Sequence, residues 1–489
     1  MPARAQRAPA LARFASATAR AAAIVCAVGC TATVAWALVS LPWRPLDGTE
    51  GHLLFDASRI RDGLRLYVDP LQGAWDYGPV PARYYVLHLP LWAGVLSLFP
   101  AAAAPHAARA LGLGAWFGLL AGTALAAPRP NRIPAWCGAL FVGGAFPLGL
   151  FGAAGRHDAP ALLLAGIGLL RSMRRGRAGP LEGGLFALAA LVKPNVVGMA
   201  AGVLLHDVAA RGRRSWPPLL AAAAVVAAGA AGLHVASSGM WLEHLLRSTQ
   251  TTPIASLWLD QMRTRLPFFA LPLAAAGWWA WRGRSIASAR VGGWALVASS
   301  AWTTWSLAKV GSASNYWMEP CVAALAIVSR VRVPGVGEQA AAAAAALALG
   351  QSSWVGVAAV RSSIEALGSG RAKTAALEGA RRACGAAPND VVIADEVGLE
   401  MMLDGRVVQV PFVMTHLVRA GRYPVALWTE DVTRSEVRCL AMQSDLLERP
   451  LDQVDVADDL YEPQMRRILR DHFQLVSATG GIWLYRAKR

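Results

Sequence analysis

Two carboxylates open a charged segment in the first part of this sequence. Asp47 and Glu50 begin "DGTEGHLLFDASRIRDGLRLY", residues 47–67, directly after a long apolar run. A carboxylate at the edge of a cavity can act as a general base that removes a proton from an attacking hydroxyl or amine. The alternative interpretation is that one of the two only caps a helix.

A third carboxylate, Asp158, lies in "GRHDAP" (155–160), where another apolar run begins. Arg156 precedes it by two residues. Asp158 is therefore interpreted either as a helix cap paired with Arg156 or as a second acid facing the same cavity.

The segment "WLEHLLR" places Glu243, His244 and Arg247 on one turn of a predicted helix. A surface ion pair explains this spacing. A lone Glu–His pair is weak evidence for a metal site, because complete sites need more ligands.

Lys193, Arg247 and Lys309 lie at the ends of three different pairs of apolar runs. Together such cations suit an anionic headgroup, for example a phosphate. The alternative is that their charges reach past the apolar surface into solvent. Tyr316, which follows "GSASN", either adds a hydroxyl to this set or anchors the chain at a membrane interface.

A carboxylate base and a set of cations suit group transfer from a lipid phosphate. The phosphate is the leaving group, and the cations stabilise its developing charge. The sequence contains no G-x-x-x-x-G-K-[ST] loop, so no motif for using nucleotide energy is present.

Composition indicates which elements must position these residues. The chain has 489 residues, of which 55% are hydrophobic and 16% are charged. An average soluble protein has about 25% charged residues. The apolar runs have the length that spans a bilayer, about 17–25 residues, so the sequence predicts an all-α polytopic membrane protein.

The net charge of +16 is carried by short arginine clusters between the apolar runs. Such clusters are typical of cytoplasmic loops and do not indicate nucleic acid as a partner. Placing every cluster inside predicts about eleven transmembrane helices, at about 21–42, 106–127, 134–153, 159–172, 181–193, 195–208, 217–237, 267–281, 291–308, 316–329 and 340–360.

This topology divides the chain into a cytoplasmic tail (1–20), a transmembrane domain (21–360) and a C-terminal domain (361–489). A cleaved signal peptide is the alternative for the first apolar run. The first outer loop, residues 43–105, has helical spacing over 50–67, which predicts an amphipathic juxtamembrane helix whose leucines face lipid. The apolar run 84–104 of that loop is interpreted as a helix in the outer leaflet.

The C-terminal domain lacks spanning runs and is predicted to be a small α/β domain outside the membrane. Strands are expected at 390–395, 406–411 and 481–487, and a helix at 462–473. Outside the membrane, Cys384 and Cys439 can pair. Their positions in the sequence do not establish that they lie in contact.

In this order, the motifs resemble those of the GT-C superfamily of polyprenyl-phosphate-dependent glycosyltransferases. The nearest branch holds the lipid A aminoarabinose transferases and the protein O-mannosyltransferases. The resemblance covers about residues 20–330. It is carried by "EGHLLFDASRIRDGLRLY", "YGPVPARYY", "RHDAP", "VKPN", "WLEHLLR" and the pattern of Lys309, Tyr316 and Pro320.

The resemblance implies an inverting glycosyltransferase whose first-loop carboxylate is the general base. Family members often have Asp-Glu at this loop, whereas position 49 here is Thr. The base is therefore Glu50 or Asp47, with Glu50 favoured, and Asp158 is the further acid. The donor phosphate would be bound by Lys193, Arg247, Lys309, Tyr316 and Arg156. No cofactor is firmly implied; a divalent metal held by His244 with Glu50 is an option.

The implied partners are a polyprenyl-phosphate-sugar donor, membrane lipids and a lipid, glycan or protein acceptor. The implied location is the bacterial cytoplasmic (inner) membrane, with several spans and a periplasmic C-terminal domain. The alternative function is a transporter or flippase for a lipid-linked or anionic solute, which would show paired halves with broken helices at the midplane. A third is an assembly subunit whose charged loops bind a partner.

Overall fold

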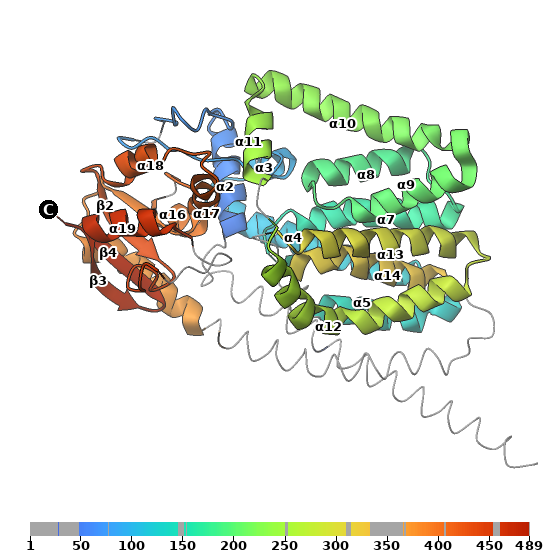
Figure 1. Ribbon diagram of the computed structural model, residues 1–489. Coiled ribbons are helices and arrows are strands. Elements are labelled where there is room, and N and C mark those ends of the chain that lie inside the picture. The colour runs from blue at the N-terminus through green and yellow to red at the C-terminus, as the bar shows by residue number, and fades with distance from the viewer. Residues whose placement is uncertain are drawn as a thin grey trace, which may run out of the picture. The chain divides into compact units, whose positions relative to one another are not determined.

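The structure is a computed structural model that divides the chain into two compact units (Figure 1). One unit holds residues 1–38, 108–229 and 253–363, and the other holds residues 39–107, 230–252 and 364–489. The residues described are Val28, Glu365, 48–76, 78–144, 151–152, 154–249, 253–309, 314–332, 368–404, 407–452 and 460–488. Asp47, the tail 1–20, all of the predicted span 21–42 except Val28, and the span 340–360 lie outside these residues.

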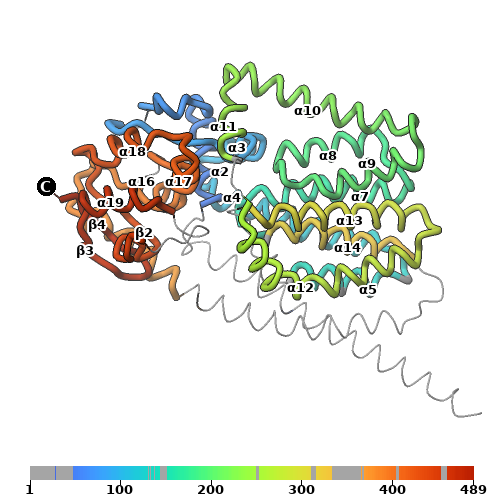
Figure 2. Tube along the Cα trace, viewed as in Figure 1, coloured from blue at the N-terminus to red at the C-terminus, as the bar shows by residue number. Residues whose placement is uncertain are grey.

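The first unit is built from long helices (Figure 2). They are α4 (Ala104–Leu125), α5 (Arg132–Gly144), α7 (Asp158–Arg175), α8 (Pro180–Val192), α9 (Gly198–Arg211), α10 (Trp216–Ser237), α12 (Ala255–Arg282), α13 (Ala287–Ser306) and α14 (Met318–Arg330). α4 and α10 each extend into the second unit. The predicted spans that fall on described residues coincide with these helices, because apolar run length and flanking Arg, Gly and Pro are local signals.

Two helical stretches of the described residues are long and apolar enough to cross a membrane alone, Ala104–Leu125 and Gly198–Ser237. The helices α8 and α9 have only 13 and 14 residues. Both are shorter than the roughly 20 residues that a full span needs. This agrees with the prediction that the chain turns at Lys193 after a short helix.

Glycines allow α9 to lie directly on α13. A Cβ atom at Gly198 would lie 2.5 Å from the Cα atom of Ser299, and one at Gly202 would lie 2.3 Å from the carbonyl oxygen of Trp294. The two glycines are four residues apart and so share one face of α9. This contact fixes the start of α9, and with it the preceding turn, against α13.

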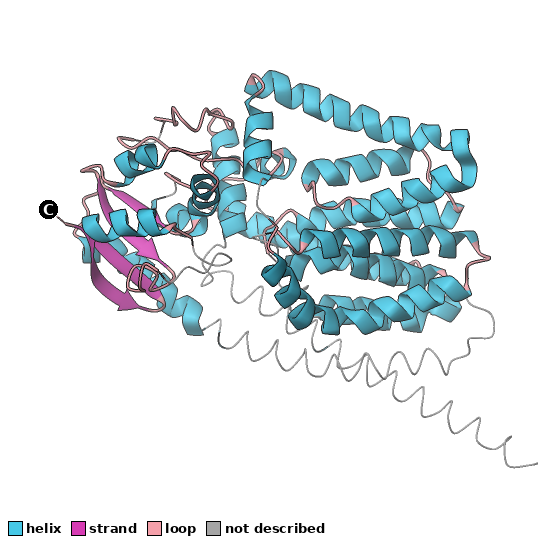
Figure 3. Ribbon diagram, in the orientation of Figure 1, coloured by secondary structure: helices cyan, strands magenta, loops and turns pink. Residues whose placement is uncertain are grey.

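The second unit contains a four-stranded mixed sheet with the order β1-β2-β4-β3 (Figure 3). β1 runs parallel to β2, and β4 runs antiparallel to both β2 and β3. The strands are β1 (Val391–Ala394), β2 (Val437–Met442), β3 (Phe473–Thr479) and β4 (Ile482–Ala487). The helices are α2 (Gly48–Arg61), α3 (Leu91–Ser97), α11 (Met240–Thr249), α16 (Val397–Asp404), α17 (Pro411–Arg419), α18 (Val425–Val432) and α19 (Pro463–His472), together with a helix at residues 368–384.

The prediction of a small C-terminal α/β domain is confirmed, with one wrong strand. Strands form at β1 and β4 and a helix at α19, as expected, while β2 and β3 were not predicted. The predicted strand 406–411 is wrong, because Pro411 begins α17 and Gln409 forms only an isolated bridge to Arg83. Val407, Val408 and Val410 pack into a core instead of extending a sheet.

For residues 50–67, the prediction of an amphipathic helix at the membrane interface is also wrong about what surrounds the helix. α2 ends at Arg61, and every residue from Glu50 to Arg59 is buried in protein. Leu53 and Leu54 therefore do not face lipid. Arg59, fully buried, donates to Asp76 Oδ2 at 2.6 Å, and its charge lies over the Tyr84 ring.

The apolar run 84–104 is not a continuous helix. It contains only the seven-residue α3 and the first residue of α4. Its first residues are buried and belong to no helix or strand. The Tyr84 hydroxyl donates to Leu66 O at 2.9 Å, and Val86 N donates to His244 Nδ1 at 2.9 Å. Aromatic and β-branched residues at 84–86 thus join a protein core that also includes Ile393 of β1.

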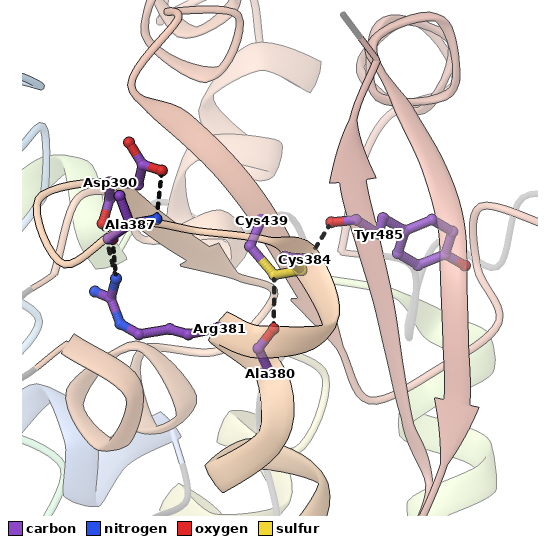
Figure 4. The surroundings of a disulfide bond; sticks show 7 residues. All are labelled: Ala380, Arg381, Cys384, Ala387, Asp390, Cys439 and Tyr485. Atoms are coloured by element: carbon purple, nitrogen blue, oxygen red, sulfur yellow. Dashed lines mark hydrogen bonds between the residues drawn. A yellow bond between two sulfur atoms is a disulfide. The ribbon is translucent and has the colours of Figure 1, made fainter.

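A disulfide joins Cys384 and Cys439 (Figure 4). Cys384 ends a helix formed by residues 368–384, and Cys439 lies in β2. The bond ties this helix to the sheet. The sequence left this pairing open, and the structure supplies it.

Removing this disulfide is expected to lower the free energy of unfolding. The bond closes a loop with a sequence separation of 55 residues, and bonds of this kind contribute about 2–4 kcal/mol. The double variant Cys384→Ser/Cys439→Ser should unfold at a lower temperature than wild type. In the control variant Cys321→Ala, Cys384 and Cys439 should still be joined and should offer no free thiol before reduction. Wild-type protein that is reduced before alkylation should carry two more alkyl groups, by mass, than wild-type protein that is alkylated without reduction. Full alkylation without reductant would contradict the bond.

Candidate functional site

Asp158 is the centre of a polar cluster in the helical unit. It is the first residue of α7 and is 1% exposed. Its Oδ1 accepts hydrogen bonds from Lys193 Nζ and from Asn315 Nδ2, the latter at 2.7 Å. Its Oδ2 accepts from Arg156 Nε at 3.2 Å. One carboxylate therefore holds a lysine, an arginine and an amide that come from three separate parts of the chain.

The turn between α8 and α9 delivers Lys193 to this cluster. α8 ends at Val192, and Lys193 has an extended backbone with φ −144° and ψ 107°. Pro194 follows and cannot donate the backbone hydrogen bond that would continue the helix. Asn195 is held there because its carbonyl oxygen accepts from Trp302 Nε1 of α13 at 2.8 Å.

Tyr316 faces the same turn from a short 3-10 helix, η3 (Ser314–Trp317). Its hydroxyl accepts from Asn195 Nδ2 at 2.8 Å, and Lys193 Nζ lies 5.7 Å from the centre of its ring. Its backbone carbonyl accepts from Thr303 Oγ1 at 2.9 Å. Lys193 and Tyr316 are therefore neighbours, as a joint role requires.

A small hollow lies among these side chains. Its polar lining consists of Asp158, Lys193, Asn195, Thr303, Asn315, Tyr316 and Glu319. Glu319 is 4% exposed, and its Oε1 accepts from Met199 N at 2.7 Å, so it caps the start of α9. The hollow thus combines the cation of Lys193 with amide and hydroxyl groups, and the carboxylates of Asp158 and Glu319 line it as well.

Glu50 belongs to the other unit. It lies in the first turn of α2 and is 2% exposed. The positive end of the helix dipole favours a carboxylate at this position. Nearby on the same helix, burial raises the pKa of Asp56 to about 8, against the opposing charge of Arg59.

His244 of α11 joins two segments of the first loop. Val86 N donates to its Nδ1 at 2.9 Å, so Nδ1 carries no proton. Nε2 must then carry the proton, and it donates to Val68 O at 2.6 Å. Both ring nitrogens are used by backbone groups, which leaves none to bind a metal with Glu50 in this arrangement. Among the described residues, no three or more His, Cys, Asp or Glu side chains group as a metal site.

The two remaining predicted cations have other partners in the structure. Arg247 Nε donates to Glu243 Oε1 at 2.7 Å, and Arg247 NH1 donates to Arg422 O at 3.2 Å. This ion pair is the plainer of the two interpretations of "WLEHLLR". Lys309 follows α13, is partly buried and forms a backbone bridge with Pro253.

The structure brings together four of the predicted residues, Asp158, Arg156, Lys193 and Tyr316. Glu50, His244 and Arg247 are in the second unit. Sequence reasoning missed Asn195, Asn315 and Glu319 as members of the site. A signal existed for each. Asn195 ends "VKPN" and Asn315 ends "GSASN", the segments that already supply Lys193 and precede Tyr316, and Glu319 opens an apolar run as Asp158 does.

Comparison with known proteins gives a match in structure alone. No protein-family model matches the sequence, and no curated protein matches it significantly. The crystal structure of ArnT from Cupriavidus metallidurans in the apo state superposes with a TM-score of 0.52 and 13% sequence identity, covering 93% of this chain and 96% of that chain. The expected resemblance to the GT-C aminoarabinose transferases is thus confirmed at the level of the fold: this chain has an ArnT-like fold.

Proposed function

We propose that this protein is a membrane glycosyltransferase that moves a sugar from a polyprenyl-phosphate donor to a lipid, glycan or protein acceptor. The observation that carries the proposal is the ArnT-like fold over 93% of the chain. The Lys193–Asp158–Arg156 cluster supports it, because Lys193 lines the hollow, Arg156 is bonded to the same carboxylate, and cations of this kind bind phosphate groups.

In the proposed reaction, Glu50 accepts the proton of the acceptor hydroxyl or amine. The acceptor atom then forms a bond to the anomeric carbon, and the bond from that carbon to the phosphate oxygen breaks. The electron pair of that bond leaves with the polyprenyl phosphate, and the anomeric configuration inverts. Asp47 remains the alternative base, since the two acids are three residues apart.

Lys193, Arg156 and Tyr316 would stabilise the charge that develops on the leaving phosphate. Asp158 is better suited to hold these cations than to accept a proton, because it already accepts from both Lys193 and Arg156. Arg247 and Lys309 are proposed as further phosphate contacts. The exposed Arg247–Glu243 pair is worth only about 0–1 kcal/mol, so exchanging Glu243 for a phosphate costs little.

The proposed location is the cytoplasmic membrane of a bacterium, with the C-terminal domain on the periplasmic side. The helical unit supports membrane insertion through its long apolar helices. The Cys384–Cys439 disulfide supports the placement of the C-terminal domain, because such bonds persist in oxidising compartments. The proposed division remains a tail (1–20), a transmembrane domain (21–360) and this domain (361–489).

Binding of polyprenyl phosphate to the purified protein in detergent tests the proposal, measured by calorimetry or native mass spectrometry. Lys193→Met should weaken binding by roughly 10- to 100-fold, because a hydrogen bond to a charged group contributes about 1.5–3 kcal/mol. Lys488→Met is the matched control and should bind normally, since Lys488 contacts only backbone oxygen among its described partners. Wild-type protein that does not bind polyprenyl phosphate, or that moves solute across sealed vesicles instead, would contradict the proposal.

A further inference from the structure

The helix that carries Glu50 meets α16 of the C-terminal domain backbone to backbone. A Cβ atom at Gly51 would lie 2.4 Å from Gly398 N and 2.5 Å from Gly398 Cα. It would also lie 2.8 Å from the carbonyl carbon of Val397. Real Cβ contacts are not this short, so any side chain at position 51 must push the two helices apart.

α16 is itself tied to the sheet through a buried acid. Glu400 is 0% exposed, and its two carboxylate oxygens accept from Ala394 N at 3.0 Å and Val408 N at 2.9 Å. Ala394 is the last residue of β1. The first turn of α16 is therefore anchored to the end of a strand and to the segment before α17.

Side chains after β1 extend this anchorage to β2 and reach the start of α2. Gln443, which follows β2, donates from its backbone N to Asp395 Oδ2 at 2.7 Å and from its Nε2 to Glu396 Oε2 at 2.6 Å. Lys373 Nζ donates to Gln443 Oε1 at 3.1 Å. The other Glu396 oxygen, Oε1, would lie 3.7 Å from a Cβ atom at Gly48, the first residue of α2.

We infer that the C-terminal domain positions the catalytic base: the packing of α16 against α2 fixes the position of Glu50. This inference rests on the proposed role of Glu50. Gly51, Gly398 and Glu400 are positioning residues in it, since each acts through α2 and none is assigned contact with substrate. The C-terminal domain thereby becomes part of the active-site framework, instead of only a cover over the cavity or an acceptor-binding module.

The size of the effect follows from how catalysis depends on distance. A shift of about 1 Å in a catalytic group can lower the rate on the order of 100-fold. A backbone-to-backbone contact fixes α2 more closely than a contact made by flexible side chains does, because backbone atoms cannot change rotamer to absorb a displacement.

The test is the turnover of a polyprenyl-phosphate-linked sugar by Gly51→Ala. We expect kcat to fall on the order of 100-fold, with KM for the donor unchanged because Lys193, Arg156 and Tyr316 lie in the other unit. Gly94→Ala is the matched control: Gly94 is also a helical glycine of the first loop, and a Cβ atom there meets nothing within 4 Å. Wild-type kcat in Gly51→Ala, or equal loss in Gly94→Ala, would overturn the inference.

A second variant decides the question even if Gly51→Ala does not accumulate. Glu400→Gln keeps the shape of the side chain but faces one backbone N–H with an amide that cannot accept its hydrogen bond. Amide hydrogen exchange should then quicken in Gly48–Arg61 as well as in Val397–Asp404, while Leu91–Ser97 stays unchanged. Exchange that quickens only around α16 would show that α16 does not hold α2.

Glu50→Gln in the same turnover assay separates this inference from the proposed function. If Glu50→Gln stays active, the base assignment fails, yet the exchange experiment still reports whether α16 holds α2. If Glu50→Gln is inactive and Glu400→Gln leaves both the amide exchange of α2 and kcat unchanged, the base assignment stands and the inference that α16 positions α2 is wrong.

Discussion

Glu50→Gln is expected to lower kcat by about 10²- to 10⁴-fold, the contribution of a general base to a proton-transfer step. The amide cannot accept a proton but keeps the size of the side chain, so donor binding should change little. Turnover is measured as polyprenyl phosphate released from a polyprenyl-phosphate-linked sugar.

Asp47→Asn is the matched control for this variant, because Asp47 lies three residues before Glu50 in the same segment. If Glu50 is the base, Asp47→Asn keeps most of the activity. The opposite pattern would transfer the role to Asp47. Full activity in both variants would mean that neither first-loop acid is the base.

Asp158→Asn is expected to destabilise the fold strongly. Asp158 accepts from Lys193, which is 7% exposed, and from Arg156. Breaking a buried ion pair on one side costs about 3–5 kcal/mol, because the remaining charge has no partner. The measurement is thermal or denaturant unfolding of the purified protein, with and without polyprenyl phosphate.

Two comparisons sharpen this test. Asp445→Asn removes an acid from an exposed pair with Arg449, and such pairs are worth about 0–1 kcal/mol. Lys193→Met added to Asp158→Asn should recover part of the lost stability, because it removes one of the unpaired charges. If the phosphate binds these cations, polyprenyl phosphate should stabilise Asp158→Asn more than wild type. Equal destabilisation by Asp158→Asn and Asp445→Asn would contradict the buried pairing.

Part of the site was accessible from the sequence because its members share a simple position. Asp158, Lys193 and Tyr316 each lie where an apolar helix begins or ends, and a polar residue there is conspicuous in an otherwise apolar stretch. Asp158, Lys193 and Tyr316 come into contact because the helix ends that carry them lie side by side. The hydrogen bonds of Asn195 and Asn315 were not accessible, because an asparagine in a turn has many local partners to choose from.

The surroundings of α2 were mispredicted for a different reason. Apolar residues every three or four positions show that one face of a helix is buried, but they do not show what covers it. Here protein covers both faces, so even Asp56 and Arg59 are buried. The same limit applies to residues 84–86, whose apolar side chains suit a lipid leaflet and a protein core equally well.

By itself, the sequence determined the helices of the first unit, two strands and one helix of the C-terminal domain, and the turns between helices in which Asp158, Lys193 and Tyr316 lie. Each of these depends on neighbours along the chain: run length, helical or strand period, and the Arg, Gly and Pro residues that end an element. Only the tertiary structure decided that Gly51 packs against Gly398 and that Cys384 pairs with Cys439. It also decided that both ring nitrogens of His244 form hydrogen bonds with backbone groups. These contacts join residues far apart in the chain, and their geometry depends on how whole elements pack, which no local pattern records.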